Sequence, residues 1–161
     1  MTEISLRRVV PADAAAIGAV FDAAVRVGWT YMGDMVAEPM FPPEEWDHDV
    51  AEFAPPNLML AAVDETDRIV GFTAVKIAEG ELYLLFVDPA FGGRGIGHLL
   101  LDAAHDAMRA AGRTESFLYT HESNERALAV YGAAGYRRDG AVRESDFRGL
   151  HLREPRLVKP L

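Results

Sequence analysis

The sequence is most informative between residues 87 and 98, which are Val87-Asp88-Pro89-Ala90-Phe91-Gly92-Gly93-Arg94-Gly95-Ile96-Gly97-His98. This segment joins an expected apolar strand to an expected helix with an apolar stripe from Ile96 to Ala111. Its glycines carry no Cβ atoms, so backbone N–H groups can approach a ligand closely. Unpaired amides and a positive dipole at a helix N-terminus suit a diphosphate. The segment therefore predicts a phosphate-binding turn, although a tight strand–helix connection would have the same composition.

Two common phosphate-binding motifs do not fit this segment. A Walker A loop ends in Gly-Lys-Ser/Thr, whereas Gly97 is followed by His98 and Leu99. A dinucleotide-binding fingerprint needs G-x-G-x-x-G after the first strand. Here the spacing from Gly93 is G-x-G-x-G, and it follows the fourth expected strand.

The surrounding segments predict one α/β (α+β) domain over residues 1–161. Strands are expected at 3–10, 58–63, 69–77, 82–87 and 117–120, and twice within 136–158. Helices are expected from Pro11 to Gly28, over 43–53, after the glycine turn and over 124–134, whereas 29–43 has an irregular pattern. Three strands joined by short turns predict an antiparallel meander, and the helix after the fourth strand permits a parallel crossover. We therefore expect a central mixed, mostly antiparallel sheet of about seven strands with flanking helices.

Composition and net charge limit the kinds of ligand and partner that are expected for this protein. The 161 residues have a formal net charge of −9 and include no cysteine. Binding of nucleic acid is therefore disfavoured, and thiolate metal sites are excluded; we expect no metal. The N-terminus lacks the apolar core of a signal peptide, and no apolar run approaches the roughly 18 residues of a membrane span. We expect a cytoplasmic protein without a membrane partner, and a homodimer is compatible with the sequence. An acidic surface favours cationic ligands such as amines, although it also simply maintains solubility.

Two motifs, in the right order, resemble those of the GNAT superfamily of N-acetyltransferases. The first covers 84–101 and resembles the family's strand, Val-x-Pro, Arg/Gln-x-x-Gly-x-Gly/Ala and helix, with Gly92 at the Arg/Gln position. The second, from Asn124 to Tyr136, resembles Asn-x-x-Ala-x-x-x-Tyr followed by Gly and an aromatic residue. The resemblance implies transfer of acetyl from acetyl-CoA to a primary amine of a small molecule, on a sheet splayed between strands 4 and 5. A protein or peptide amine, or a non-catalytic acyl-CoA-binding module, are the alternatives.

The resemblance also implies contacts with coenzyme A. Amides of the glycine turn would hold the pyrophosphate, and an amide near Leu85 or Phe86 would act as an oxyanion hole. Asn124 would bind the pantetheine arm, cap a helix, or do both. Tyr131 would protonate the leaving thiolate, or would only pack in the core. The expected cofactor contacts are Leu85, Phe86, Val87, Gly92, Gly93, Arg94, Gly95, Ile96, Gly97, His98, Asn124 and Tyr131.

Two residues compete for the role of general base. By resemblance, Glu81 lies where the histone-acetylating branch of the family has its catalytic glutamate. Period-2 alternation places Glu81 on the face of Leu85 and Val87 unless a bulge intervenes. His121, at the end of the fifth strand, has an intrinsic pKa better matched to neutral pH. Either residue could instead be a polar strand end, and the sequence leaves the choice open.

By resemblance, the acceptor lies beneath the first two helices and their connection. This connection is rich in aromatic residues with interspersed carboxylates, which suits an organic ammonium through cation–π contact and charge. The same side chains could also simply cover the sheet. The expected acceptor contacts are Trp29, Tyr31, Glu38 and Phe41, and Glu144, His151 and Glu154 could line the same cleft.

Overall fold

A computed structural model of the chain describes residues 3–161, so residues 1 and 2 of the expected domain lie outside it. Seven strands form one sheet in the order β1-β2-β3-β4-β5-β7-β6. The strands are β1 (Ser5–Arg8), β2 (Leu58–Val63), β3 (Ile69–Lys76), β4 (Glu81–Val87), β5 (Glu115–Tyr119), β6 (Arg137–Phe147) and β7 (Leu150–Pro160). The helices are α1 (Ala14–Gly28), α2 (Pro43–Glu52), α3 (Ile96–Ala110) and α4 (Glu125–Ala133), with short 3-10 segments η1 (Pro11–Asp13), η2 (Thr30–Val36) and η3 (Pro89–Phe91). The mixed sheet predicted from the sequence is confirmed.

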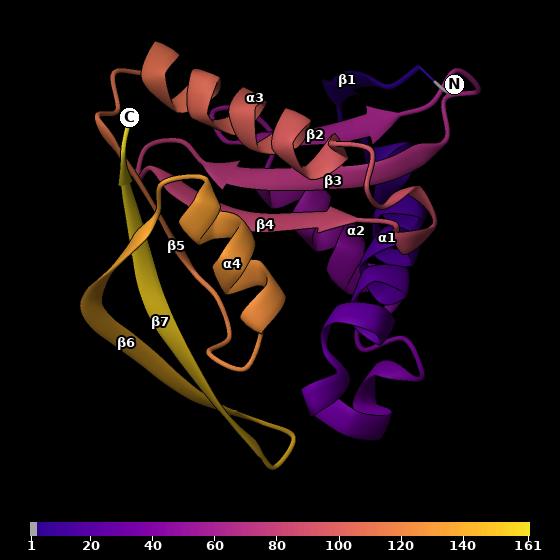
Figure 1. Cartoon of the computed structure of the whole chain (residues 1–161). Helices are drawn as coiled ribbons and strands as arrows, with labels where there is room; N and C mark the ends of the chain where they lie inside the picture. Colours follow the sequence, from indigo (N-terminus) through magenta and orange to yellow (C-terminus); the bar gives the residue numbers. More distant parts are fainter. Residues whose placement is uncertain (1–2) are drawn as a thin grey trace.

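Helices cover both faces of β2–β4 (Figure 1). On one face, α1 and α2 bury Phe21 and Trp46 against Phe72 of β3. On the other face, α3 contributes Leu100 and Met108 to two further clusters. These α3 side chains lie on the apolar stripe predicted from its i, i+4 spacing. Among residues 3–161, none of the helices is both long and apolar enough to span a membrane.

The sheet opens between β4 and β5. β2, β3 and β4 form the predicted antiparallel meander, whereas β4 and β5 are parallel. The two strands pair only at Glu81 and Phe117, beside a hydrogen bond of 3.0 Å from the Phe117 N–H to the Gly80 carbonyl. From there the strands diverge, and α4 lies in front of the opening (Figure 1). The facing edge of β4 is therefore left without a strand partner over most of its length.

A bulge in β4 overturns the predicted side-chain alternation. The register between β3 and β4 shifts by one residue beside Tyr83. Beyond this shift, Leu85 packs with the α3 clusters and Val87 does the same. Glu81 instead lines a cavity with Leu84, toward α1 and α2. The sequence placed Glu81 on the face of Leu85 and Val87 unless a bulge intervened; the bulge is present, and its inserted residue puts Glu81 on the opposite face.

The connection between α1 and α2 is more ordered than the irregular segment predicted. It contains η2, which is interrupted at Gly33, where φ is +62°. Met32 and Met40 are buried in the core. The ring of Phe21 contacts those of Trp29 and Phe41, with centroids at 5.5 Å and 5.7 Å. The connection thus packs onto α1 through apolar side chains that the sequence also allowed as ligand contacts.

The β6–β7 hairpin reaches back to this connection. Its turn residues Arg148 and Gly149 both have positive φ, as a tight two-residue hairpin turn requires. The Arg148 guanidinium donates a hydrogen bond of 2.6 Å to the Met40 carbonyl. The rings of Phe147 and Phe41 have centroids 6.1 Å apart. These contacts place the hairpin beside the helices that cover the first half of the sheet.

Candidate active site

Two cavities lie beside the diverging ends of β4 and β5. The first, of about 360 Å³, is lined by the end of α1, β4, the glycine turn and α4; we call it the glycine-turn groove. The second, of about 370 Å³, is lined by α1, α2, β4, the end of β5 and the middle of β6 and β7; we call it the aromatic cavity. Trp29 lines both. The two cavities therefore meet beside its indole ring.

The glycine turn presents bare backbone to the first cavity. Gly93 and Gly95 have φ of +74° and +76°, a left-handed conformation that favours glycine. A Cβ atom added at either position would meet no protein atom within 4 Å. Because Gly95 precedes α3 without a side chain to cap it, the first N–H groups of α3 are left for solvent or a ligand. The turn therefore fits a phosphate group.

Nearly all the cofactor contacts expected from the sequence lie in this groove. Its lining includes Leu85, Phe86, Val87, Gly92, Gly93, Gly95, Ile96, Gly97, His98, Asn124 and Tyr131. Arg94 does not line it; the Arg94 guanidinium instead lies 5.1 Å from the centre of the Phe91 ring. Among the expected cofactor contacts, Arg94 is therefore the one whose side chain packs on a neighbouring ring and does not line the groove.

Helix α4 contributes Asn124 and Tyr131 to the groove. The side-chain oxygen of Asn124 accepts a hydrogen bond of 3.1 Å from the Ala127 N–H, so it caps the helix. Its amide N–H groups are not used by this bond and can donate to a ligand. Burial, with a smaller contribution from Tyr136, raises the pKa of Tyr131 above its usual value of 10.0. The phenol therefore stays protonated at neutral pH and can donate a proton.

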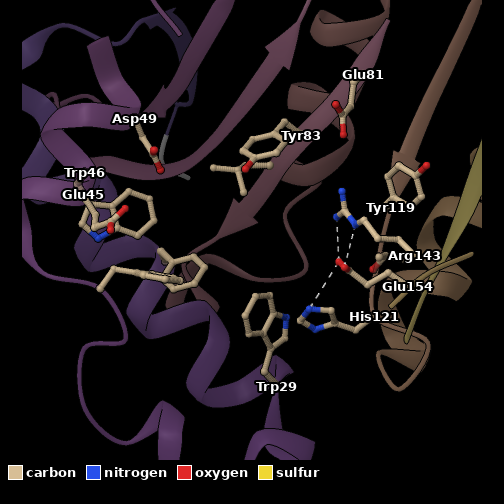
Figure 2. Close-up of a pocket in the computed structure, with 14 residues that line it drawn as sticks. Trp29, Glu45, Trp46, Asp49, Glu81, Tyr83, Tyr119, His121, Arg143 and Glu154 are labelled. Carbon is tan, nitrogen blue, oxygen red and sulfur yellow. Dashed lines mark hydrogen bonds and ion pairs between the residues drawn. The ribbon is translucent and has the colours of Figure 1, made fainter. Parts of the chain in front are cut away.

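Aromatic rings and carboxylates line the second cavity (Figure 2). Its rings come from Phe21, Trp29, Phe41, Trp46, Tyr83 and Tyr119, and its carboxylates from Glu45, Asp49, Glu81 and Glu154. Arg143 is the positively charged side chain in the described lining. Of the acceptor contacts expected from the sequence, Trp29 and Phe41 line the cavity. Tyr31 contacts His121 but does not line the cavity, and Glu38 is exposed outside it.

His121 lines the aromatic cavity and contacts Trp29, the residue that both cavities share. Its ring is centred 4.6 Å from that of Trp29, and its Nδ1 lies 2.5 Å from the Tyr31 hydroxyl oxygen. The adjacent Glu122 N–H donates to the Arg153 carbonyl at 2.8 Å, which holds this segment beside β7. Burial lowers the pKa of His121 below its usual 6.5, against the opposing effect of Glu154. The imidazole is therefore mainly neutral at pH 7 and can accept a proton.

Glu154 is a site residue to which the sequence assigned only a general place in the cleft. Arg143 binds it through two hydrogen bonds, of 3.0 Å from Nε and 3.2 Å from Nη2. Along β7, Leu150 and Leu152 pack into the core, so period-2 alternation points Glu154 inward. His151 points outward and pairs with the exposed Glu144, outside the cavity. Arg143 was not predicted as a site residue, because its position opposite Glu154 depends on how β6 pairs with β7.

Glu81 lines the aromatic cavity at the closed end of the strand opening. It pairs with Phe117, the point at which β4 and β5 are still joined. Burial raises the pKa of Glu81 above its usual 4.5, and Lys76 opposes the shift. Trp29, by contrast, marks the junction of the two cavities and contacts His121. Both candidate bases thus line the same cavity, but of the two only His121 contacts Trp29.

A group of polar side chains on α2 includes Asp49 of the aromatic cavity. His48, Asp49 and Glu52 bring potential metal-ligating atoms within 4.8 Å of one another. His48 and Glu52 are exposed, and the distances from His48 Nδ1 to the two carboxylates are 3.7 Å and 3.9 Å. These distances are those of surface ion pairs, and exposed pairs of this kind contribute little to stability.

Comparison with known proteins places the chain among acetyltransferases. The family model described as "Acetyltransferase (GNAT) family" matches residues 25–136. A mycothiol acetyltransferase of Renibacterium salmoninarum is 36% identical over 150 residues, covering 85% of this chain and 41% of the relative. One of Clavibacter sepedonicus is 42% identical over 100 residues, covering 60% of this chain and 32% of the relative. The chain thus spans less than half of the length of these relatives.

Solved structures share the whole fold. A GCN5-related N-acetyltransferase from Rhodopseudomonas palustris has a TM-score of 0.77 at 25% identity, covering 100% of this chain and 98% of that one. PaiA N-acetyltransferase from Thermoplasma acidophilum, solved with coenzyme A, has a TM-score of 0.76 at 21% identity and covers 99% of both chains. The family match, the sheet open between β4 and β5 and the glycine turn agree. The chain belongs to the GNAT family of acetyltransferases.

Proposed function

We propose that this chain transfers the acetyl group of acetyl-CoA to a primary amine of a small molecule. The observation that carries the proposal is the meeting of two unlike cavities at Trp29. One presents backbone N–H groups that suit a diphosphate, and the other presents aromatic rings and carboxylates that suit an ammonium. The names of the relatives, and the coenzyme A with which PaiA N-acetyltransferase was solved, support the same function.

The glycine-turn groove suits the nucleotide end of acetyl-CoA. The first N–H groups of α3 would bind its pyrophosphate, and the unpaired edge of β4 would bind the pantetheine arm. The Asn124 amide would donate to the same arm while its oxygen caps α4. Backbone N–H groups near Leu85 or Phe86 would stabilise negative charge on the thioester oxygen. When bound, acetyl-CoA supplies the activated acetyl group.

His121 is the proposed general base. It lines the aromatic cavity beside Trp29, it is mainly neutral at pH 7, and its Nε2 is not bonded to Tyr31. When Nε2 carries no proton, it can remove one from the acceptor's ammonium group, which leaves a nucleophilic amine. Glu81 would instead contribute negative charge at the closed end of the cavity, which favours binding of a cation.

Tyr131 is the proposed general acid. It lies in the groove on α4, and burial keeps its phenol protonated. Coenzyme A leaves as a thiolate, to which the Tyr131 hydroxyl would donate a proton. Its ring also packs edge-on against Tyr136, with centroids 5.7 Å apart. Packing and proton donation use different parts of the side chain, so the two roles are compatible.

The proposal is tested by measuring free thiol released from acetyl-CoA across a panel of amines. The panel contains alkylamines, amino acids, mycothiol-related compounds and a short peptide with a free N-terminus. We expect amine-dependent release with a small molecule, and slower release by Tyr131→Phe. Preference for the peptide would identify a protein acceptor. Binding of acetyl-CoA without release for any amine would show a non-catalytic module.

A further inference from the structure

We propose that Tyr31 is a positioning residue that keeps the His121 proton on Nδ1, so that Nε2 and Glu154 together receive the acceptor's ammonium group. This inference rests on the proposed function, because it concerns the removal of a proton from the acceptor. Tyr31 lies on η2, does not line the aromatic cavity, and is separated from His121 by 90 residues in the chain. Its effect would therefore be transmitted through the imidazole ring.

The orientation of His121 is restricted on several sides. The Tyr31 hydroxyl oxygen lies 2.5 Å from His121 Nδ1, and the two rings are nearly perpendicular, with an interplanar angle of 87°. The Trp29 ring packs against the imidazole, with ring centroids 4.6 Å apart. The other nitrogen, Nε2, faces Glu154 Oε1, which lines the cavity. The His121 and Glu154 side chains are only 12% and 13% exposed, so both are largely shielded from water.

The spacing between Nε2 and Glu154 suits a third atom. The two atoms are 3.8 Å apart, which is too long for a direct hydrogen bond. One nitrogen atom can lie about 2.9 Å from both, the usual length of an N–H···O or N–H···N bond. A primary ammonium placed there would donate one N–H to each. Arg143 holds the Glu154 carboxylate in place by its two hydrogen bonds.

The proton transfer is balanced within this group. The Nε2 lone pair takes a proton from the ammonium, and the amine nitrogen keeps the electron pair of the broken N–H bond. The resulting imidazolium would donate from Nδ1 to the Tyr31 oxygen, and the negative charge of Glu154, 3.8 Å from Nε2, would stabilise it. Burial and Glu154 raise the pKa of Tyr31 above its usual 10.0, so the phenol remains neutral and can accept from Nδ1.

In the opposite tautomer, His121 could not act as the general base. If the Tyr31 hydroxyl donated to Nδ1, Nε2 would carry the proton and could not accept another. An Nε2–H directed at the Glu154 carboxylate would be expected to form a charge-assisted bond of about 2.8 Å. The observed 3.8 Å favours a bare Nε2. The charged groups around the ring are Glu154 on β7 and Arg143 on β6, with Glu81 of β4 in the same cavity.

The tautomer can be measured without turnover. Nitrogen-15 chemical shifts of the imidazole distinguish Nδ1–H from Nε2–H, and His121→Asn identifies which signals belong to His121. We expect the Nδ1–H tautomer in the wild-type protein and a shift toward Nε2–H in Tyr31→Phe. An Nε2–H tautomer in the wild-type protein would overturn the inference, whatever the activity of the enzyme.

Kinetics with two acceptors separate positioning from a structural effect. An alkylamine is protonated at neutral pH and needs the base, whereas a fluorinated analogue is already neutral and does not. We expect Tyr31→Phe to lower kcat/KM for the alkylamine by roughly tenfold or more, and to change that for the neutral amine little. Equal losses with both acceptors would contradict the inference.

Thr30→Val is the matched control for these kinetics. It removes another hydroxyl from η2 at an exposed position that does not line the cavity. We expect it to leave both acceptors unaffected. If the wild-type protein acetylated neither amine, the proposed function would fail, and the tautomer measurement would still decide the role of Tyr31.

Discussion

Gly95→Ala is expected to weaken the binding of acetyl-CoA while preserving the fold. Gly95 precedes α3 with φ of +76°, a conformation that costs an L-residue roughly 1–2 kcal/mol. An added Cβ would meet no protein atom within 4 Å, so this strain is the main cost to the unliganded protein. Gly112, just beyond the other end of α3, has φ of +84° and equally open surroundings. Gly112→Ala is therefore a matched control, because Gly112 does not line the groove.

The expected effect on ligand binding follows from the place of the new methyl group. It would stand in the groove beside the N–H groups to which phosphate oxygens must come close, and we expect at least tenfold weaker binding. At 100 times the wild-type dissociation constant, acetyl-CoA stabilises the native state by about 2.7 kcal/mol. A tenfold weaker site leaves about 1.4 kcal/mol at the same concentration. For a domain of this size these correspond to Tm increases of about 5–11 °C and about 3–6 °C.

Thermal melts of the three proteins, with and without acetyl-CoA, measure these differences. Both variants should melt at a similar, slightly lower temperature than the wild type without ligand. With ligand, Gly112→Ala should show the full wild-type increase in Tm, and Gly95→Ala about half of it or less. Equal increases in the two variants would refute the assignment of Gly95 to the phosphate site, since only the groove distinguishes the two positions.

Four further predictions concern side chains around the site. Tyr131→Phe should lower kcat by roughly tenfold or more with almost unchanged acetyl-CoA affinity, because one proton donor is lost; normal turnover with weaker binding would make Tyr131 a cofactor contact. Tyr136→Phe should lower the free energy of unfolding by about 1–3 kcal/mol in urea titrations, because the Tyr136 hydroxyl forms a hydrogen bond of 2.7 Å with buried His105. Tyr131→Phe should lower it less, since the Tyr131 hydroxyl has no hydrogen bond among the described residues. For an acceptor that stays protonated, kcat/KM should rise with pH through the pKa of His121, below 6.5, because the neutral imidazole is the active form; a profile flat through that range would contradict its role as base. Glu81→Gln should raise KM for the amine more than it lowers kcat; a loss of kcat at neutral pH that recovers at high pH would move the base role to Glu81.

The glycine turn and the α4 motif could be predicted from the sequence because each is continuous in the chain. The residues from Val87 to His98 adopt their strand–turn–helix arrangement through local backbone preferences, with glycine where φ is positive. Asn124 and Tyr131 share one helix, so their spacing places them together. Most of the residues expected to contact the cofactor therefore line one groove, whereas the Arg94 guanidinium lies over Phe91.

The aromatic character of the cavity could be predicted from the sequence, but the residues that line it could not. Aromatic residues between α1 and α2 were expected to line it or to cover the sheet, and the structure uses Phe41 for the cavity while it buries Met32 and Met40. Glu38 was expected at the site but is exposed outside it. Which side of a connecting segment faces inward depends on its packing against other elements, and such a segment has no regular period to reveal it.

Sequence alone determined the elements whose causes are local: the glycine turn, the apolar stripe of α3, the strand meander and the cap of α4. Tertiary structure decided the face of Glu81, because a bulge beside Tyr83 reverses the alternation of β4. It also decided the contact of Tyr31 with His121 and that of Arg143 with Glu154. Contacts of this kind depend on how strands pair and how connections pack across the whole domain, and the order of residues along a single strand or helix does not contain that information.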